Sequence, residues 1–198
     1  MSDSASIIAF QGAHGANSDM ACRAVFPEMI TLPCDDFENA FEAVATNIAK
    51  YAMIPIDNSL AGRVADIHHL MPKSGLYIIG EHFQRVKHQF LAIPGTKIED
   101  VTHVHSHIHA LNQCRNLIRD LGIQPVVHAD TAGAARDIAK WSNKTQAALG
   151  SSLAARLYGL EILRNGVEDA THNTTRFVIM SREIEMPSQG ECEVVTSF

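Results

Sequence analysis

Short apolar runs alternate with helical patterns along almost the whole chain, and this alternation limits the fold more than any other feature. Residues 6–10 (SIIAF) predict a strand, which a glycine-containing loop joins to a helix over residues 18–26 with Ser18 as its N-cap. The residues on one face of a second helix are Phe37, Phe41, Val44 and Ile48. Further strands are expected at 51–56, 101–105, 125–129, 146–149 and 160–163, an extended segment at 76–93, and helices at 63–71, 109–121, 132–141 and 152–158. This order predicts an α/β fold with mixed, largely parallel sheets.

Composition excludes several classes of protein. Of 198 residues, 46% are hydrophobic and 19% charged, which is ordinary globular composition and supplies a core for one or two small domains. No apolar run approaches the roughly 18 residues that span a bilayer, and the first residues lack the pattern of a signal peptide, so we expect a cytoplasmic protein without membrane contact. The net charge is −6 with scattered lysine and arginine, which argues against nucleic acid and favours a small-molecule partner. The four cysteines show no CxxC spacing and are interpreted as free thiols.

Small polar residues occupy the junctions where predicted strands lead into helices. In an open α/β sheet such junctions gather at the carboxyl ends of the strands, where helix N-termini present free backbone N–H groups. Each junction alone fits a simple helix cap or tight turn, but together they favour an anionic ligand in a cleft. The junctions are residues 12–18 (GAHGANS), 56–62 (IDNSLAG), 105–109 (HSHIH), 130–133 (DTAG) and 150–152 (GSS).

Histidines alternate at positions 103, 105, 107 and 109, which on one continuous strand would place all of them on a single face. We expect a strand-to-helix junction within this stretch, so the alternation breaks and no native metal site is predicted.

The segment HNTTRFVIM (residues 172–180) places hydroxyls and an arginine directly before an apolar run. The apolar run predicts a buried strand, while its polar start fits either a solvated turn or part of a site. The choice depends on what the fold places beside it.

Several ordered motifs carry a resemblance to a known family. They are residues 12–21 (GAHGANSDMA), 55–62 (PIDNSLAG), 106–114 (SHIHALNQC), 131–132 (TA), 157–160 (LYGL) and 175–177 (TRF). With these motifs the chain resembles prephenate dehydratase of the alphaproteobacterial type over almost its whole length.

The resemblance implies two α/β lobes similar to type II periplasmic binding proteins, with the active site in the cleft between them. It implies residues 1–82 with 176–186 as the first catalytic lobe and residues 83–175 as the second. Residues 187–198 would be a linker and the start of the ACT regulatory domain that usually follows in the family.

The implied activity is the decarboxylating dehydration of prephenate to phenylpyruvate, carbon dioxide and water, in L-phenylalanine biosynthesis. Prephenate carries two carboxylates and a ring hydroxyl, which suit the polar junctions. No cofactor is implied, because aromatisation of the ring needs no external electron sink. The family also implies a homodimer or a higher homo-oligomer.

The resemblance assigns catalysis to Thr175, whose hydroxyl would assist departure of the ring hydroxyl. Arg176 would hold one substrate carboxylate as a bidentate pair, and Phe177 would anchor the segment in the core. The other substrate-binding candidates lie in the remaining motifs: Asn58, Ser59, Ser106, His107, Thr131, Ala132 and Thr174.

The chain departs from the family pattern in its first loop, where Ala13-His14 stands in place of a proline before the second glycine, and at three further positions. Asp57 replaces a glutamate, and Ile108 and His109 replace a proline and a glutamine. Two other functions remain open: arogenate dehydratase, whose substrate has an amino group in place of the keto group, and a non-catalytic sensor of small carboxylates. Turnover of prephenate separates enzyme from sensor, and comparison of both substrates separates the two dehydratases.

Overall fold

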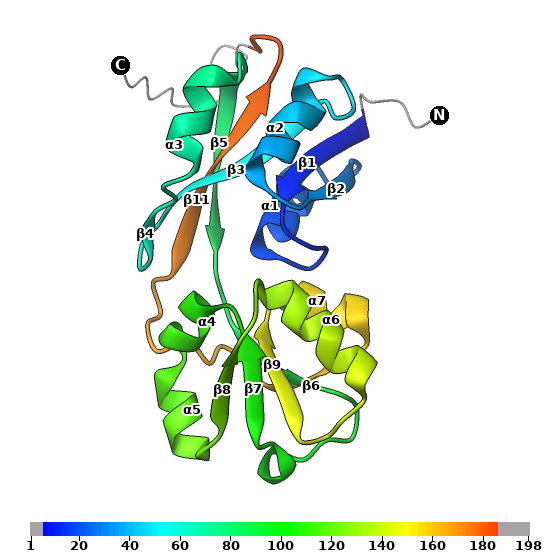
Figure 1. Cartoon of the computed structure of the whole chain (residues 1–198), viewed down its shortest axis with the longest axis vertical. Coiled ribbons are helices and arrows are strands. Elements are labelled where there is room, and N and C mark those ends of the chain that lie inside the picture. Colours follow the sequence, from blue (N-terminus) through cyan, green and yellow to red (C-terminus); the bar gives the residue numbers. More distant parts are fainter. Residues whose placement is uncertain (1–5, 186–198) are drawn as a thin grey trace.

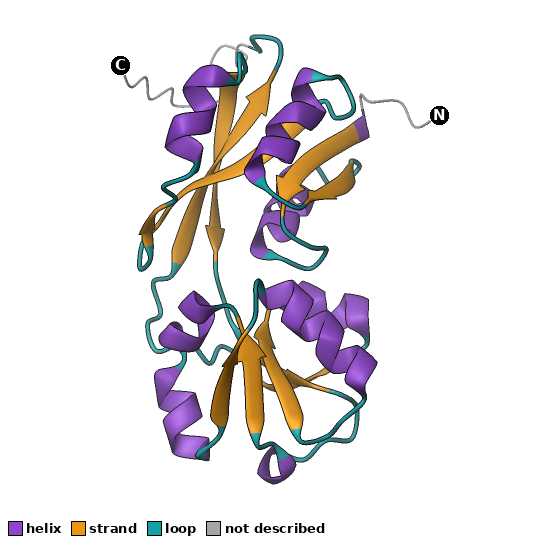
Figure 2. Ribbon diagram, in the orientation of Figure 1, coloured by secondary structure: helices purple, strands orange, loops and turns teal. Residues whose placement is uncertain are grey.

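The computed structural model describes residues 6–185, which form two β-sheets lying one above the other in Figure 1. Each sheet is covered by helices on both faces (Figure 2). The fold is therefore α/β with mixed sheets, as the alternation of strand and helix patterns predicts.

The first sheet and its helices, called lobe 1 below, comprise β1 (Ile7–Gln11), α1 (Asn17–Val25), β2 (Ile30–Cys34), α2 (Phe37–Ala45), β3 (Tyr51–Asn58), β4 (Gly62–Arg63), α3 (Ile67–Leu70), β5 (Tyr77–Arg85) and β11 (Thr174–Ser181). The strand order is β2-β1-β3-β11-β5, and β4 pairs with β3. β1 is parallel to β2 and β3, whereas β11 is antiparallel to β3 and β5. Alternate residues pack on opposite faces, so Phe177 and Ile179 lie in the cluster with α1 and Val178 lies in the cluster with α2.

The second sheet and its helices, called lobe 2, comprise β6 (Gln89–Ala92), β7 (His103–Ser106), α4 (Ile108–Gln113), α5 (Arg115–Leu121), β8 (Gln124–Val127), α6 (Thr131–Trp141), β9 (Gln146–Gly150), α7 (Ser152–Tyr158) and β10 (Glu161–Arg164). The strand order is β10-β6-β9-β7-β8. β7 is parallel to β8 and β9, and β6 is antiparallel to β9 and β10. One face packs against α4 and α5, and the other against α6 and α7.

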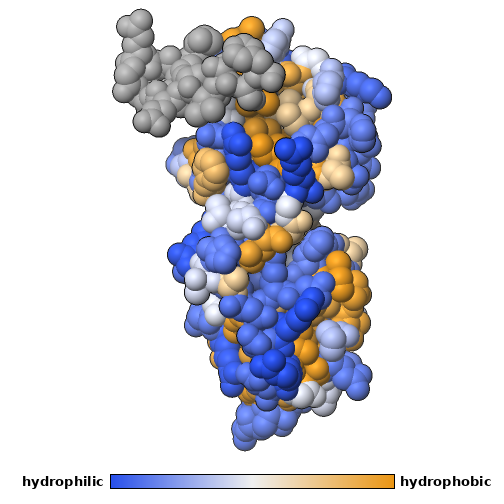
Figure 3. Space-filling view, turned by 90° about the vertical axis from the view of Figure 1, so that its left-hand side faces the viewer, coloured by the Kyte–Doolittle hydropathy of each residue, from blue (hydrophilic) through white to orange (hydrophobic). Residues whose placement is uncertain are grey.

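The chain passes between the lobes twice, through residues 86–88 (the first crossing) and residues 165–173 (the second crossing). The crossings are hydrogen-bonded to each other, from Val86 N to Asn173 O and from Val167 N to His88 O, each 2.9 Å. The molecule narrows at this level in the space-filling view (Figure 3). Since β5 and β11 run continuously through positions 82–83 and 175–176, we propose lobe boundaries at the crossings instead of inside these strands.

Most predicted elements occur within a few residues of their expected positions, and the break in the histidine alternation is confirmed. β7 ends at Ser106, and His107 is the N-cap of α4. The extended segment at 76–93 contains β5 and β6, one in each sheet, and so makes the first crossing.

Some predictions about local structure are wrong, and one strand was missed. Helix α1 begins at Asn17 with Ala16 as its N-cap, so Ser18 lies inside the helix. α2 ends at Ala45, which leaves Ile48 beyond the helix and 55% exposed. The helix expected at 63–71 is reduced to α3, preceded by β4 and followed by a 3-10 turn at Met71–Lys73. β2 was not predicted, because its short sequence ITLPC contains a proline, which an edge strand tolerates.

The single helix expected over 109–121 is two helices separated at Cys114. The second crossing causes the break. The carboxylate of Asp169 accepts from the N–H groups of Arg115 and Asn116 at 3.0 and 3.2 Å, which caps α5 from outside the helix. The N–H of Asp169 also donates to the carbonyl of Gln113 at 2.6 Å, at the end of α4.

Cys22, Cys34 and Cys114 are buried free thiols, as predicted, whereas Cys192 lies outside the described residues. The expected linker and regulatory-domain segment at 187–198 also lies outside them. Within residues 6–185, every helix is too short or too polar to span a bilayer.

Candidate active site

The loop between β1 and α1 lies against the N-terminal end of α7 in the other lobe. Ser151 donates its hydroxyl to the carbonyl of Gly15, and the hydroxyl of Tyr158 donates to the carbonyl of His14 at 2.6 Å. Gly15 has a φ of +91°, and a Cβ at this position would lie 2.8 Å from Cα of Ala154. Only glycine permits both the backbone conformation and the close approach, so Gly15 allows the two lobes to meet at this point.

The N-termini of α4, α6 and α7 face lobe 1 (Figure 1). Their N-caps are His107, Asp130 and Ser151, each accepting a backbone N–H with its own side chain. The predicted residues Thr131 and Ala132 are the first two of α6. Free N–H groups at such positions suit the carboxylates of an anionic ligand.

Helix α1 presents another polar group in lobe 1. The amide oxygen of Asn17, the first residue of α1, is buried and has no hydrogen-bond partner among residues 6–185. It is therefore an acceptor available to a ligand. Sequence reasoning gave Asn17 no role.

Asn58, at the end of β3, lies directly opposite Thr175 on β11. Its Oδ1 accepts from the N–H groups of Leu60 and Ala61 at 3.0 and 2.8 Å, so its Nδ2 must point the other way. Nδ2 donates to Oγ1 of Thr175 at 2.9 Å and to Oδ1 of Asn173 at 2.8 Å. The turn after β3 thus fixes the orientation of the amide that holds Thr175.

The chain of hydrogen bonds continues from Asn173 into lobe 2. Nδ2 of Asn173 donates to Oε1 of Gln113 at 2.7 Å, and Nε2 of His88 lies 2.9 Å from the same oxygen. Asn173 is 1% exposed and His88 is 4% exposed. Burial lowers the pKa of His88, and the hydrogen bond with Gln113 opposes this shift only in part, so the imidazole is neutral at physiological pH.

The hydroxyl of Thr175 can still donate its hydrogen in a hydrogen bond. Its oxygen accepts the amide of Asn58, and a hydroxyl that accepts still has its own hydrogen to donate. Such a donor can assist the departure of a group that leaves as an oxyanion or as water.

Ser59 and Thr174 also join this network, whereas Ser106 and His107 lie apart from it in lobe 2. Ser59 accepts from the N–H of Thr174 at 3.0 Å and donates to the carbonyl of His172 at 2.8 Å. Ser106 is fully buried in lobe 2, where its hydroxyl donates to the carbonyl of Leu149 at 2.8 Å. The pKa of His107 is lowered, chiefly by burial and then by His109.

Arg176 lies on the other face of the first sheet from Thr175, as alternation along β11 requires. Its guanidinium donates to the carboxylate of Glu81 on β5 and lies 5.9 Å from the ring centre of Phe83. The structure therefore does not bring Arg176 together with Thr175 and Asn58. Phe177 is 1% exposed and packs in the core beside α1.

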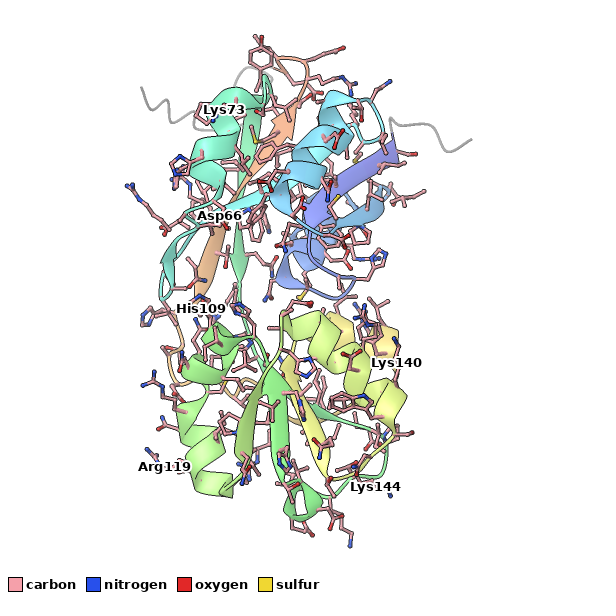
Figure 4. All side chains as sticks on the ribbon, in the orientation of Figure 1. Asp66, Lys73, His109, Arg119, Lys140 and Lys144 are labelled. Carbon is pink, nitrogen blue, oxygen red and sulfur yellow. The ribbon has the colours of Figure 1, made fainter. Side chains whose placement is uncertain are left out.

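A cavity of about 280 Å³ lies between the lobes, next to this network. Its lining combines the turn after β3 with α4 and the second crossing: Leu60, Ala61, His109, Asn112, Gln113, Asp169 and Ala170. His109 is labelled in Figure 4, on α4 at the level where the lobes approach each other. Gln113 belongs to both the cavity and the hydrogen-bond chain.

Sequence reasoning gave no role to His88, Gln113 or Asn173. Gln113 and Asn173 occur inside quoted motifs, which was a usable signal. His88 carried no signal, because a single buried histidine has no pattern of its own.

Comparison with known proteins gives the family. The family model of prephenate dehydratase matches residues 8–185. The chain belongs to the prephenate dehydratase family. It is 55% identical over 176 residues to a bifunctional N-acyl-homoserine lactone acylase/prephenate dehydratase of Komagataeibacter europaeus, a match covering 89% of this chain and 63% of the relative. It is 42% identical over 182 residues to arogenate dehydratase/prephenate dehydratase 6 of Arabidopsis thaliana, covering 91% of this chain and 44% of the relative.

A solved structure agrees with the family assignment. The crystal structure of prephenate dehydratase from Arthrobacter aurescens, in complex with L-Phe, superimposes with a TM-score of 0.85 at 27% identity. The match covers 92% of this chain and 62% of that protein. This dehydratase-family chain thus spans less than two thirds of each of these three relatives.

Proposed function

We propose that the protein converts prephenate to phenylpyruvate, carbon dioxide and water. Membership of the dehydratase family supports the reaction class. The observation that carries the mechanism is the hydrogen bond from Asn58 to Thr175, which leaves the threonine hydroxyl as a donor beside the junction of the lobes.

In the proposed reaction, the bond between the ring carbon and its carboxylate breaks, and its electron pair enters the ring. The carbon–oxygen bond at the opposite ring carbon breaks at the same time, so the leaving oxygen gains negative charge. Thr175 donates a hydrogen bond to that oxygen, and one proton taken up from solvent completes the water molecule. Because the ring becomes aromatic as the bonds break, a weak acid is sufficient for this role.

The lobes supply binding and exclusion of water. The carboxylates of prephenate would meet helix N-termini of lobe 2, where Thr131 and Ala132 open α6 and His107 caps α4, together with Thr174 at the start of β11. The hydroxyls of Ser59 and Ser106 already donate to backbone carbonyls, so these two residues would shape the junctions and not bind the carboxylates. Arg176 is a further carboxylate ligand in this proposal, provided that its guanidinium leaves Glu81 and reaches the face of the sheet on which Thr175 lies. Closure of the lobes at Gly15 would shield the reacting ring from water.

The test is turnover of prephenate, followed as phenylpyruvate, by the parent and by Thr175→Ala and Thr175→Ser. Thr175→Ala should reduce kcat by about 10²–10⁴, with KM nearly unchanged, because only a donor used in the transition state is lost. Thr175→Ser should keep part of the activity. Parental turnover by Thr175→Ala would exclude the catalytic role, and no turnover by the parent would exclude the function.

Arogenate is the second candidate substrate, because a relative 42% identical to this chain is named for both dehydratase activities. The two substrates differ by an amino group in place of a keto group. Measuring kcat/KM on both, with the same protein, decides the preference. Under our proposal prephenate has the higher value.

The acylase activity named for the Komagataeibacter europaeus relative is not part of the proposal. Acylases of the serine type need a hydroxyl paired with a general base. The hydroxyls of Ser59, Ser106 and Ser151 instead donate to the backbone carbonyls of His172, Leu149 and Gly15.

The proposal also includes a cytoplasmic location and a homodimer formed through the catalytic lobes. Sedimentation that shows only monomer at assay concentration would contradict the dimer.

A further inference from the structure

The mechanism proposed above does not use the buried side chains of His88 and Asn173 or the partly buried side chain of Gln113. Their hydrogen bonds nevertheless lead to the amide of Asn58, which holds Thr175. The three residues come from three separate places: the first crossing, the end of α4 and the second crossing. Through Asn58 they connect lobe 2 to Thr175 in lobe 1. A chain of this kind makes the orientation of Thr175 depend on how the lobes sit against each other.

The direction of every bond in this chain is determined. Backbone N–H groups at Leu60 and Ala61 can only donate, so they hold Oδ1 of Asn58 and turn its Nδ2 toward Asn173. Asn173 must therefore present Oδ1 to Asn58 and its Nδ2 to Gln113.

The orientation of Gln113 and the tautomer of His88 are fixed in the same way. Because Oε1 of Gln113 accepts from Asn173, it is also the atom that faces the ring of His88. An amide oxygen cannot donate, so Nε2 of His88 must carry the hydrogen, and the neutral ring is the Nε2-protonated tautomer. One backbone turn in lobe 1 thus specifies the tautomer of a buried histidine at the other end of the chain.

We propose that His88, Gln113 and Asn173 form an oriented relay that positions Asn58, and through it Thr175, for the dehydration. This inference rests on the proposed function. Two donors converge on the single oxygen of Gln113, and this convergence keeps Asn173 from flipping its amide. If Asn173 flipped, two N–H groups would face each other, and Nδ2 of Asn58 would lose an acceptor and with it its hold on Thr175.

Residues that only held the lobes together would behave differently from a relay. Their loss would lower stability or raise KM, and the change would be the same whether or not residue 175 carries a hydroxyl. Loss of a relay lowers kcat, and only while the hydroxyl is present, because its single effect is to aim that hydroxyl.

The experiment is a double-mutant cycle with Gln113→Leu and Thr175→Ala, measured as kcat and KM on prephenate. Gln113→Leu alone should lower kcat by about 10–100-fold, as is usual when a residue that orients a functional group through a hydrogen bond is lost, with KM changed less than about threefold. In the Thr175→Ala background it should have almost no further effect. Equal losses in both backgrounds would overturn the relay.

Gln113→Glu is the conservative partner, because a carboxylate keeps the acceptor that His88 and Asn173 need. It should retain more kcat than Gln113→Leu, and the opposite order would contradict the assigned polarity. Gln89→Leu is the matched control. Gln89 is 6% exposed and also accepts from the second crossing, at Gly166 N, but it lies outside the relay, so its loss should leave kcat unchanged within about twofold.

A readout without substrate separates failure of the relay from failure of the proposed function. Nitrogen-15 NMR of the histidine rings should show His88 protonated at Nε2, and this signal should change in Gln113→Leu but not in Gln89→Leu. An Nδ1-protonated His88 would overturn the relay even in an active enzyme. If the parent fails to turn over prephenate while His88 has the expected tautomer, the proposed substrate is wrong and the relay geometry stands.

Discussion

Arg176 and Glu81 form an ion pair across β11 and β5, with Nη2 2.7 Å from Oε2, on the opposite face of the sheet from Thr175. Their side chains are 43% and 38% exposed, and pairs as exposed as this contribute only about 0–1 kcal/mol. A substrate carboxylate can therefore displace Glu81 at small cost. Substitution of each member of the ion pair tests whether the guanidinium of Arg176 binds a substrate carboxylate.

Arg176→Lys should raise KM for prephenate by about tenfold with little change in kcat, because an ammonium cannot reproduce two parallel donors. Glu81→Gln is the companion variant. Removal of the competing carboxylate should leave KM equal or lower. Unchanged KM in both variants would show that Arg176 serves only its partner on β5.

Gly15→Ala should reduce kcat/KM at least tenfold, since a Cβ 2.8 Å from Cα of Ala154 forces the lobes apart. Small-angle scattering should show a larger radius of gyration. Gly75→Ala is the control: Gly75 also has a positive φ, of +68°, but a Cβ there meets nothing within 4 Å. Both variants bear the backbone strain, so equal activity in the two would rule out a role for Gly15 in lobe closure.

The order of elements could be predicted from the sequence because hydrophobic periodicity is local. The break between α4 and α5 could not, since the side chain that caps α5 lies 54 positions away, at Asp169. The strand β2 was missed for a different reason: it is a short edge strand, stabilised by its parallel pairing with β1 more than by its own composition.

The candidate site also has features that the sequence predicts and features that it does not. Motifs identified Asn58 and Thr175, because each lies in a short recognisable stretch. The bond between them and the chain through Asn173 depend on strand pairing and amide orientation, which one sequence does not contain. The opposite placement of Arg176 could have been predicted, because it follows from alternation along the expected strand.

Stability should fall as the pH falls below about 6.5. The pKa values of His88, His105 and His107 all lie below the ordinary 6.5, in each case chiefly because burial disfavours the charged ring. The unfolded chain therefore binds more protons as pH decreases through this value, so protonation favours unfolding. Urea denaturation at intervals from pH 8 to pH 5 measures the effect.

His105→Gln should weaken this pH dependence. His105 bonds to Gln146 at 2.6 Å and to His128 at 3.1 Å, and a glutamine can make similar bonds without titrating. A variant whose stability fell as steeply as that of the parent between pH 7 and pH 5 would show that His105 is not a source of the effect.

Asp169→Ala should cost about 0.5–2 kcal/mol of stability, the usual worth of a helix cap, because the first N–H groups of α5 lose their acceptors. It should also lower kcat, because the lost carboxylate anchors the second crossing to α5 and thereby positions the backbone N–H of residue 169, which holds the end of α4 at Gln113. Denaturant unfolding and turnover of prephenate give the two quantities.

Asp36→Ala separates the two effects. Asp36 caps α2 by accepting from Asn39 N at 2.7 Å, so its loss should cost a similar amount of stability. Helix α2 packs in the core of lobe 1 and contributes no residue to the hydrogen bonds that connect Asn58, Asn173 and Gln113. The kcat of Asp36→Ala should therefore stay at the parental value. A loss of kcat in Asp169→Ala no greater than in Asp36→Ala would mean that the second crossing stabilises lobe 2 without aligning the catalytic threonine.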